Sequence, residues 1–385
     1  MVGFGARSSL GLFLEPMTID RGWSRETFGL ALALQNLFWG LGLPIAGALT
    51  DKLGASRIIM IGAVVYAFGL YLMGIVETES LLYLSAGILS GLGIAFSAFS
   101  LALAAMVKVV GPERRTIILG LGTAAGSFGQ VVFSPLAQSF IQLLSWSATL
   151  SILSLIVLLM IPLAFVLPSE KTSGHAPVAA VDQTLRDALS EAFAHRGFVL
   201  LTIGFFVCGF HVAFITVHFP AYVRDVGLDP SIGAWSISLI GLFNIAGSFL
   251  AGYVGQKYSM KISLSTIYSL RALLIFILLM SPKTALVILC FAACMGILWL
   301  STVPLTTGII AQVFGVRYMA TLFGIVFLSH QIGSFIGVWL GGALYDNTGS
   351  YDSMWWAGIA LGLLAAIIHL PINEKPLARL NVQIG

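Results

Sequence analysis

The sequence predicts an all-α membrane protein with twelve transmembrane helices in two six-helix, pseudo-symmetric bundles. Apolar residue types make up 58% of the 385 residues, charged types make up only 9%, and the mean hydropathy is +0.99. Soluble domains carry charge on roughly a quarter of their residues. A bilayer core of about 30 Å needs about 20 apolar residues per helix, and runs of that length exclude the alternating pattern of a membrane barrel.

The first half of the chain contains six apolar runs of helical length. The first run begins at Met1, with no basic region ahead of it and no small-residue cleavage site. We therefore expect a transmembrane helix truncated at its start rather than a signal peptide. Ser24 precedes the second run as a candidate N-cap. An N-terminal bundle over residues 1–167 is predicted from helices at 1–18, 27–50, 58–76, 82–107, 116–144 and 147–167.

Residues 168–196 are the one long polar segment and predict a linker between the bundles. In its later part Leu185, Leu189 and Phe193 recur every four residues, which predicts an amphipathic helix on the membrane surface. An irregular loop is the alternative. A C-terminal bundle over residues 197–385 is predicted from helices at 198–223, 232–254, 262–280, 285–313, 319–344 and 353–372.

The distribution of Lys and Arg predicts the orientation, because cytoplasmic loops carry an excess of these residues. One face of the predicted bundle carries Lys52, Arg57, Lys108, Arg114, Arg115, Lys171, Arg186, Arg196, Lys257, Lys261, Arg317, Lys375 and Arg379. The other face carries Arg21, Arg25, Arg224 and Lys283. We expect the first face, with both termini and the linker, to lie in the cytoplasm of a cell whose inner or plasma membrane holds the protein.

The two halves also match each other in sequence. Setting Pro16 against Pro220 places Arg7 opposite His211, and the tripeptide G-S-F occurs in both the fifth and the eleventh predicted helix. A nearly constant offset between such matches favours a duplicated architecture over coincidence.

The segment G-A-L-T-D-K-L-G-A-S-R, residues 47–57, joins the second and third helices through a very short turn, which glycine permits. Its pattern of Gly47, Asp51, Lys52, Gly54 and Arg57 resembles the loop 2–3 signature of the major facilitator superfamily, the twelve-helix secondary transporters. The resemblance implies six helices, a linker and six helices, arranged as parallel repeats. It also implies a cytoplasmic gate.

In that gate Asp51 is expected to meet the N-terminal end of the eleventh helix, whose dipole favours a negative charge. The contact would exist only while the cytoplasmic side is closed. Pairing of Asp51 with Lys52 or Arg57 is the alternative, and an exposed pair of that kind is worth about 0–1 kcal/mol.

Three segments are similar to bacterial members of the monocarboxylate porter and oxalate/formate antiporter branch. They read G-A-R-S-S-L-G-L-F-L-E-P-M, G-W-S-R and G-G-A-L-Y-D-N-T-G-S-Y. The similarity implies transport of a small organic anion. The eighth helix lacks the arginine that binds the anion in this branch, and the fourth helix lacks the arginine usual in drug/proton antiporters.

Other classes of function have no visible basis in the sequence. We find no metal cluster, nucleophile motif or phosphate-binding loop, and therefore expect neither enzymatic activity nor a cofactor nor a bound metal. The cations are scattered over loop ends, so a nucleic-acid partner is not expected. Cys208, Cys290 and Cys294 lie inside apolar segments, which predicts packing rather than disulfides.

Ionisable residues inside the bilayer cost free energy and are candidates for function. Arg7 lies on the first helix, which lines the central cavity in the family, and a guanidinium there would suit a carboxylate through a forked contact. Snorkelling of Arg7 toward a water-exposed end is the alternative. The other substrate-binding candidates are His211, His330, Gln331, Asn36, Asn244 and Trp299.

Three residues are candidates for carrying a coupled proton: His211, His218 and Glu15. The two histidines are seven residues apart on one helix face, and histidine titrates near neutral pH. Helix packing is the alternative for both, and hydration near a helix end is the alternative for Glu15. Arg271, in the ninth helix, is expected to have a structural role because that helix is peripheral in the family.

These observations predict a secondary transporter that works by alternating access. It would move a small organic anion together with a proton, as a monomer in the lipid bilayer. Two alternatives stay open: efflux of amphipathic or drug-like compounds, and a membrane sensor that does not transport.

Overall fold

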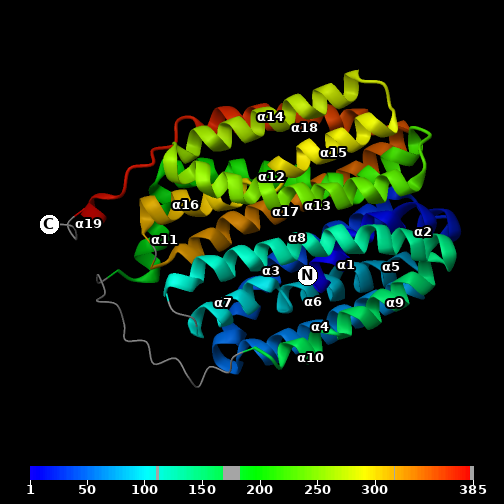
Figure 1. The fold of residues 1–385 in the computed structure, drawn as a ribbon, viewed down its shortest axis with the longest axis horizontal. Helices are drawn as coiled ribbons and strands as arrows, with labels where there is room; N and C mark the ends of the chain where they lie inside the picture. Colours follow the sequence, from blue (N-terminus) through cyan, green and yellow to red (C-terminus); the bar gives the residue numbers. More distant parts are fainter. Residues whose placement is uncertain (110–111, 168–182, 316, 382–385) are drawn as a thin grey trace.

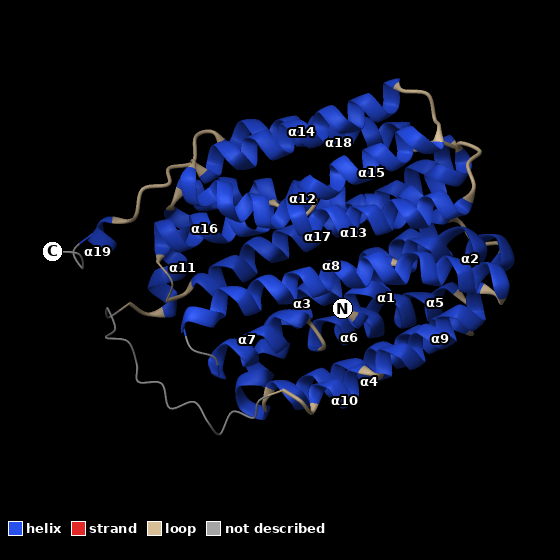
Figure 2. Ribbon diagram, viewed as in Figure 1, coloured by secondary structure: helices blue, strands red, loops and turns tan. Residues whose placement is uncertain are grey.

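The apolar runs of the sequence form long helices. A computed structural model describes residues 1–109, 112–167, 183–315 and 317–381, and some side chains within these ranges, that of Asp51 among them, are not described. Helices joined by short turns make up these ranges, which contain no strand (Figure 2). Ten segments of the described part are long and apolar enough to cross a membrane. Residues 2–21 and the helix Pro112–Leu143 complete the predicted twelve.

The N-terminal bundle occupies the lower part of Figure 1, in blue to green. Its elements are α1 (Val2–Ser8), η1 (Leu10–Phe13), α2 (Leu14–Arg21), α3 (Arg25–Leu53), α4 (Ala55–Gly74), α5 (Glu79–Leu82), η2 (Tyr83–Leu89), α6 (Ser90–Phe96), α7 (Phe99–Val109), α8 (Pro112–Leu143), α9 (Trp146–Leu158) and α10 (Met160–Ala164).

The C-terminal bundle occupies the upper part of the same view and follows the linker helix α11 (Leu185–Ala194). Its elements are α12 (Arg196–Asp225), α13 (Pro230–Lys257), α14 (Met260–Met280), α15 (Ala285–Leu298), α16 (Thr302–Phe314), α17 (Met319–Thr348), α18 (Asp352–His369) and α19 (Ala378–Asn381). The bundles meet where α3 packs on α17 and α8 packs on α13.

The two ends of these bundles differ. We call the end at which α3 begins the Arg25 end, and the end at which α3 stops and α11 lies the linker end. The predicted short turn at the linker end consists of Gly54 alone, whose φ of +88° is a conformation that suits glycine.

Four membrane-crossing segments are interrupted, whereas the sequence predicted continuous helices. The sixth divides at Leu159 into α9 and α10. Residues 2–21 contain the 3₁₀ turn η1, the fourth segment contains the π-helix η2 and a break at Ser97, and the tenth breaks between α15 and α16. In η1, a Cβ on Gly11 would lie 2.3 Å from the carbonyl oxygen of Thr216 on α12. Glycine therefore allows the backbones of the two bundles to touch there.

Buried side chains form hydrogen bonds with the backbone groups that the break in the tenth helix leaves without helical partners. Backbone groups without partners are costly in the bilayer. Arg271 of α14 is fully buried and donates from Nε and Nη2 to the Leu298 carbonyl, at 3.2 and 2.6 Å, and from Nη2 to the Trp299 carbonyl. Asn244 of α13 accepts from the Leu300 amide at 3.0 Å. The break lies just before Pro304 of α16.

The linker helix α11 packs on the C-terminal bundle. Thr184 and Asp187 form a capping box at its start, and the Thr184 hydroxyl and amide hold the pKa of the Asp187 carboxyl below its ordinary value. Glu191 pairs with Arg379 at 2.9 Å. This ion pair connects α11 to α19, the helix that contains Arg379.

The buried face of α11 differs from the predicted stripe. Leu185 and Phe193 are 45% and 57% exposed, while Ala188 and Ala192 are buried. Small alanines allow α11 to lie close to the bundle, and Leu189 of the predicted stripe packs partly buried against the C-terminal core. Leu185 and Phe193 are largely exposed, although the Phe193 ring contacts Phe198 edge-on.

The distance between the bundles changes along their length. A Cβ on Gly342 would lie 2.4 Å from the Arg25 carbonyl oxygen, and one on Gly29 would lie 2.9 Å from the Val338 carbonyl oxygen, both toward the Arg25 end. At Gly47 of α3, a Cβ would meet no described atom within 4 Å. Gly252 and Gly324, which also lie toward the linker end, meet no described atom either. Among the described residues, the bundles are therefore in close contact at the Arg25 end, and no such contact is found at these glycines of the linker end.

Replacing Arg271 with Met should lower the stability of the protein without changing its surface. The carbonyls at the break would lose a charged donor inside the bilayer, which costs about 1–3 kcal/mol. Thermal denaturation in a single detergent should show a clearly lower midpoint. Arg186→Met, on the exposed side of α11, is the control and should leave the midpoint unchanged. An equal midpoint for both variants would contradict the assigned role of Arg271.

Candidate functional site

Arg7 lies at the interface of the two bundles and is 9% exposed. Its Nη2 donates to Asn36 Oδ1 at 2.5 Å, and its guanidinium carbon lies 4.7 Å from the centre of the Trp39 ring. Among the residues that the structure describes, no carboxylate lies within ion-pair distance of it. Arg7 is therefore a buried cation whose described partners are a neutral amide and an aromatic face.

Asn36 is oriented by its own helix. Its Nδ2 donates to the Leu32 carbonyl at 2.8 Å, four residues earlier in α3, which turns Oδ1 toward Arg7. The first segment is held in place by a glycine contact, because a Cβ on Gly5 would lie 2.6 Å from the Phe133 ring of α8. Both supports come from the N-terminal bundle.

The C-terminal bundle adds aromatic and amide groups from α17. Phe327 lies edge-on to Trp39, with ring centroids 5.4 Å apart, and stacks on His330 with centroids 5.6 Å apart. His330 Nδ1 and Gln331 Oε1 are 3.1 Å apart. A Cβ on Gly40, next to Trp39, would lie 2.9 Å from the Gln331 side chain. Arg7, Trp39, Phe327, His330 and Gln331 thus form one cluster across the interface, which we call the central cluster.

Three buried N–H donors in the central cluster have no hydrogen-bond partner in the described part of the chain. They are Arg7 Nε, Trp39 Nε1 and Gln331 Nε2. A buried polar group without a partner costs about 1–3 kcal/mol. Because all three are donors and one belongs to a cation, the cluster suits a ligand with several acceptor oxygens and a negative charge.

His211 lies away from the central cluster, although the sequence repeat set it opposite Arg7. Its Nε2 is 2.8 Å from the Gly358 carbonyl oxygen of α18, and a Cβ on Gly362 would lie 3.3 Å from its ring. The ring fills the space between α12 and α18, which is the helix-packing alternative. The structure does not bring His211 and Arg7 together.

Asn244 and Trp299 also lie outside the central cluster, at the break of the tenth helix. Asn244 Nδ2 donates to Ser127 Oγ of α8 at 2.9 Å, and so connects the two bundles. Trp299 is buried, and its carbonyl accepts from Arg271. Both residues support the backbone here.

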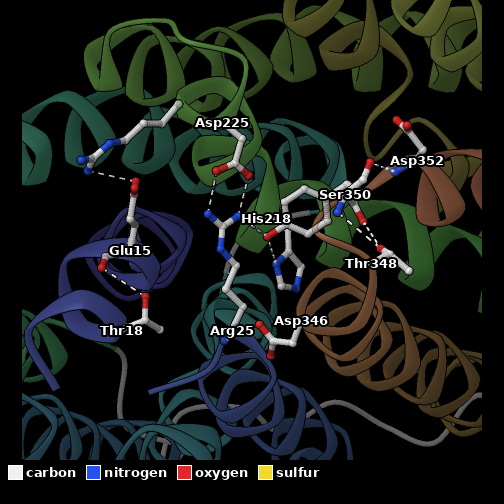
Figure 3. Close-up of polar contacts among 11 residues, drawn as sticks. Glu15, Thr18, Arg25, His218, Asp225, Asp346, Thr348, Ser350 and Asp352 are labelled. Carbon is white, nitrogen blue, oxygen red and sulfur yellow. Dashed lines mark hydrogen bonds and ion pairs between the residues drawn. The ribbon is translucent and has the colours of Figure 1, made fainter. Parts of the chain in front are cut away.

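Among the described residues, the most extensive polar contact between the bundles is at the Arg25 end, and it was not predicted from the sequence (Figure 3). Arg25 donates from Nη1 and Nη2 to the two carboxylate oxygens of Asp225 at 2.6 and 2.7 Å. Its guanidinium carbon lies 3.7 Å from the centre of the Tyr345 ring. The forked pair and the ring hold the start of α3 against the C-terminal bundle.

Asp346 adds a second contact at the same place. Its carboxylate accepts from the backbone amides of Arg25 and Glu26 at 3.1 and 2.6 Å, at the N-terminus of α3, where the helix dipole favours negative charge. Trp339 Nε1 donates to the Glu26 carboxylate at 3.1 Å. We call Arg25, Glu26, Asp225, Tyr345 and Asp346 the Arg25 latch.

His218 and Glu15 lie beside the Arg25 latch. His218 is buried, with Nε2 2.8 Å from the Val338 carbonyl oxygen and Nδ1 3.1 Å from the Tyr351 hydroxyl. That hydroxyl accepts from Arg25 at 3.0 Å. Glu15 pairs with Arg224 at 3.0 Å, from one bundle to the other (Figure 3). Both proton candidates therefore contact groups that hold this end closed.

One signal for the Arg25 latch was present in the sequence. Arg25 and Asp346 belong to G-W-S-R and D-N-T-G-S-Y, two of the segments that carried the branch resemblance. Charges of opposite sign at helix ends on one side of the predicted bundle are the recognisable pattern. Their pairing needed the three-dimensional arrangement, because the two residues are 321 positions apart.

The predicted gating residues lie at the linker end. Lys52 and Arg57 are exposed, and Gly47 faces open space among the described residues. The predicted contact of Asp51 falls on a side chain that lies outside the described part. Its role as a gate is therefore neither supported nor opposed by the structure.

Comparison with known proteins gives a family and several relatives. The sequence profile of the Major Facilitator Superfamily matches residues 1–338. The chain is 26% identical over 365 residues to "Monocarboxylate transporter 13" of Rattus norvegicus, covering 91% of this chain and 81% of the relative. It is 23% identical over 381 residues to "Uncharacterized MFS-type transporter YcxA" of Bacillus subtilis (strain 168), covering 97% and 92%.

Solved structures have the same fold. The crystal structure of a D-xylose-proton symporter matches with a TM-score of 0.78 at 14% sequence identity, covering 98% of this chain and 97% of that chain. A mutant form of the nucleoside transporter NupG matches with a TM-score of 0.75 at 12% identity, covering 96% and 98%. At these identities the likeness concerns the fold alone.

Replacing Asp225 with Asn should loosen the Arg25 end. The Arg25 guanidinium would lose an ionised partner, and a hydrogen bond to a charged group is worth about 1.5–3 kcal/mol. Spin labels at Glu77 and Lys283, in a variant whose three cysteines are replaced by serine, should report a larger population at long distance. Asp20→Asn is the control, because Asp20 pairs only within its own bundle, with Arg21 at 3.8 Å. Identical distance distributions for the two variants would contradict the latch.

Proposed function

The chain belongs to the major facilitator superfamily, and from this premise we propose that it transports a small organic anion of the carboxylate type together with a proton. Family and relatives make it a membrane transporter rather than an enzyme. The anion and the proton are the proposed part. Alternating access follows from closure at one end of the two bundles while the other end is open.

The set of unpaired donors in the central cluster carries the proposal. A guanidinium without a described carboxylate, an indole N–H and an amide N–H belong to neighbouring residues between the bundles. A carboxylate would supply the missing charge and accept several hydrogen bonds. The aromatic faces of Trp39 and Phe327 would pack on its hydrocarbon part. Two of the relatives are named as monocarboxylate transporters, which agrees with this chemistry.

His330 and Gln331 would complete the site from α17. The Gln331 carbonyl oxygen is directed at the His330 ring, so its Nε2 is free to donate to the substrate. Since the donors come from both bundles, substrate bound here would contact both of the moving parts. We propose that a monomer is the transporting unit, because the central cluster is built from one chain.

Replacing Arg7 with Ala should weaken carboxylate binding by at least about thirtyfold, because removing one partner of a buried charged pair costs about 2 kcal/mol or more. Arg7→Lys keeps the charge but loses the forked geometry, so it should recover binding only in part. Thermal-shift titration of the purified protein with a panel of carboxylates measures the affinity. Uptake into proteoliposomes at several pH values measures transport and its dependence on protons.

Arg186→Ala on α11 serves as the control, because it removes an exposed arginine far from the central cluster. If no carboxylate stabilises the protein and Arg7→Ala transports normally, the substrate class is wrong. Stabilisation by amphipathic, drug-like compounds instead would favour the efflux alternative. Stabilisation by a ligand without any counterflow would favour a sensor.

We further propose that the linker end faces the cytoplasm and that Asp51 closes it. The excess of Lys and Arg at that end supports the orientation. The open space at Gly47 and Gly324, on α3 and α17, agrees with a gate that is open in this structure. The Arg25 latch and Asp51 would then close opposite ends in turn.

The variant Asp51→Asn should reduce transport while leaving substrate affinity largely intact, because Asp51 lies outside the central cluster. Affinity from thermal-shift titration and uptake from proteoliposomes separate the two effects. Lys52→Gln, on the adjacent exposed side chain, is the control. Lost affinity with unchanged conformational exchange would contradict a gating role for Asp51.

A further inference from the structure

A cavity of ≈ 170 Å³ lies near the Arg25 end, apart from the central cluster. It is bounded by α2 and α8 of the N-terminal bundle and by α12 and the start of α13 of the C-terminal bundle. A single water needs only about 10–15 Å³ by the same measure. The cavity is therefore large enough for a small organic molecule.

Four polar side chains line this cavity: Glu15, Gln138, Gln142 and Arg224. Glu15 and Arg224 form the ion pair between the bundles, and the Arg224 side chain is 47% exposed. Gln138 is only 7% exposed, yet its amide makes no hydrogen bond to any described residue. The remaining lining is largely apolar, with Leu12, Pro16 and Ile141 among its residues. The Gln138 amide, which faces the cavity and bonds to no described residue, can therefore hydrogen-bond to a polar ligand or to water there.

The cavity and the central cluster lie on opposite sides of one contact. Gly11 touches the α12 backbone at Thr216, and Arg7 and Glu15 are each four residues from Gly11 along the first segment. Arg7, Gly11 and Glu15 thus lie on the three successive elements α1, η1 and α2, with Gly11 between the other two. With the Arg25 end closed, the cavity is the outer side of this barrier and Arg7 the inner side.

The net charge of the cavity wall indicates which kind of ligand can bind there. The ion pair makes the cavity wall neutral. An anion that paired with Arg224 in place of Glu15 would therefore leave Glu15 as a carboxylate without a counter-charge. Adding a proton from water to Glu15 removes that charge, breaks the ion pair and frees the guanidinium. Gln138 can then donate one hydrogen bond to the bound carboxylate, and the apolar wall suits a short hydrocarbon chain.

We propose that this cavity is a second, outer binding site for a small carboxylate, which enters together with a proton that adds to Glu15. The ligand carboxylate binds Arg224 and Gln138, the proton neutralises Glu15, and the net charge of the cavity does not change. This inference rests on the proposed function and specifies where substrate and proton first meet the protein.

Several charged groups surround Glu15 besides Arg224. Arg25 of α3 acts on it as a cation, Asp225 of α12 as an anion, and Tyr345 of α17 lies within electrostatic range. Because Arg25 and Asp225 neutralise each other in the Arg25 latch, Arg224 is the partner whose release changes with protonation. Loading of the cavity thereby loosens one of the ion pairs between the bundles.

The test uses 4-fluorobenzoate as probe, with ¹⁹F NMR titration of the purified full-length protein. Wild type should show two classes of site. Gln138→Leu and Arg224→Gln should each weaken one class by about tenfold or more, whereas Arg7→Ala should weaken the other class. Arg21→Gln is the matched control, because Arg21 lies on the same helix as Glu15 but does not line the cavity. The neutral 4-fluorobenzamide and the cationic 4-fluorobenzylamine should not compete.

Proton uptake is measured by calorimetry in buffers of different ionisation enthalpy. Binding at the outer site should take up about one proton per carboxylate in wild type and none in Glu15→Gln, which should still bind the probe. Size-exclusion profiles establish that each variant is folded, and Gln138→Leu keeps the side-chain volume if Arg224→Gln does not fold. Two-site binding that persists in folded Gln138→Leu, or equal proton uptake in wild type and Glu15→Gln, overturns the inference. Loss of only the outer class, with Arg7→Ala unchanged, supports the inference and overturns the central site.

Discussion

The forked pair between Arg25 and Asp225 determines how the rest of the molecule is arranged. It joins the first residue of α3 to the last residue of α12, and Asp346 reinforces it by accepting from the first amides of α3. Both contacts act at one end of long helices, so the bundles are held there and separate toward the other end. Charged pairs between desolvated groups depend strongly on geometry, and a small rotation of one bundle would break several of these contacts together. Such a contact suits a two-state closure.

Much of the architecture could be predicted because the bilayer imposes strong rules on sequence. Apolar runs, the polar linker and the turn at Gly54 follow from the cost of placing polar backbone in lipid. The interruptions of the helices could not be predicted in the same way. The break near Trp299 depends on Arg271 and Asn244, which lie 28 and 56 residues from the backbone groups they bond and supply hydrogen bonds that a helix would otherwise provide itself. Arg271, in a peripheral helix, was expected to have a structural role. In the structure it donates hydrogen bonds to the backbone carbonyls at this break.

The candidate site illustrates a different limit. Arg7 was identified because a cation in an apolar run is rare, and its neighbours Asn36, His330 and Gln331 were identified as polar residues in helices of the central cavity. Sequence repeats then set His211 opposite Arg7, yet the ring faces α18. A repeat fixes the position of a residue along a helix but not the direction in which its side chain points after two halves have diverged. Trp39 and Phe327 carried no signal, because aromatic residues are common in any apolar helix.

The single positive charge at Arg7 has an electrical consequence. Without a described carboxylate beside it, the empty central cluster carries that charge, whereas a bound monoanion neutralises it. A membrane potential acts on a moved elementary charge with about 2.3 kcal/mol per 100 mV. The proton that accompanies the anion restores that charge, so the loaded and the empty carrier bear the same net charge and the voltage acts on both steps in opposite senses. A complete cycle that moves one carboxylate and one proton would therefore carry no net current.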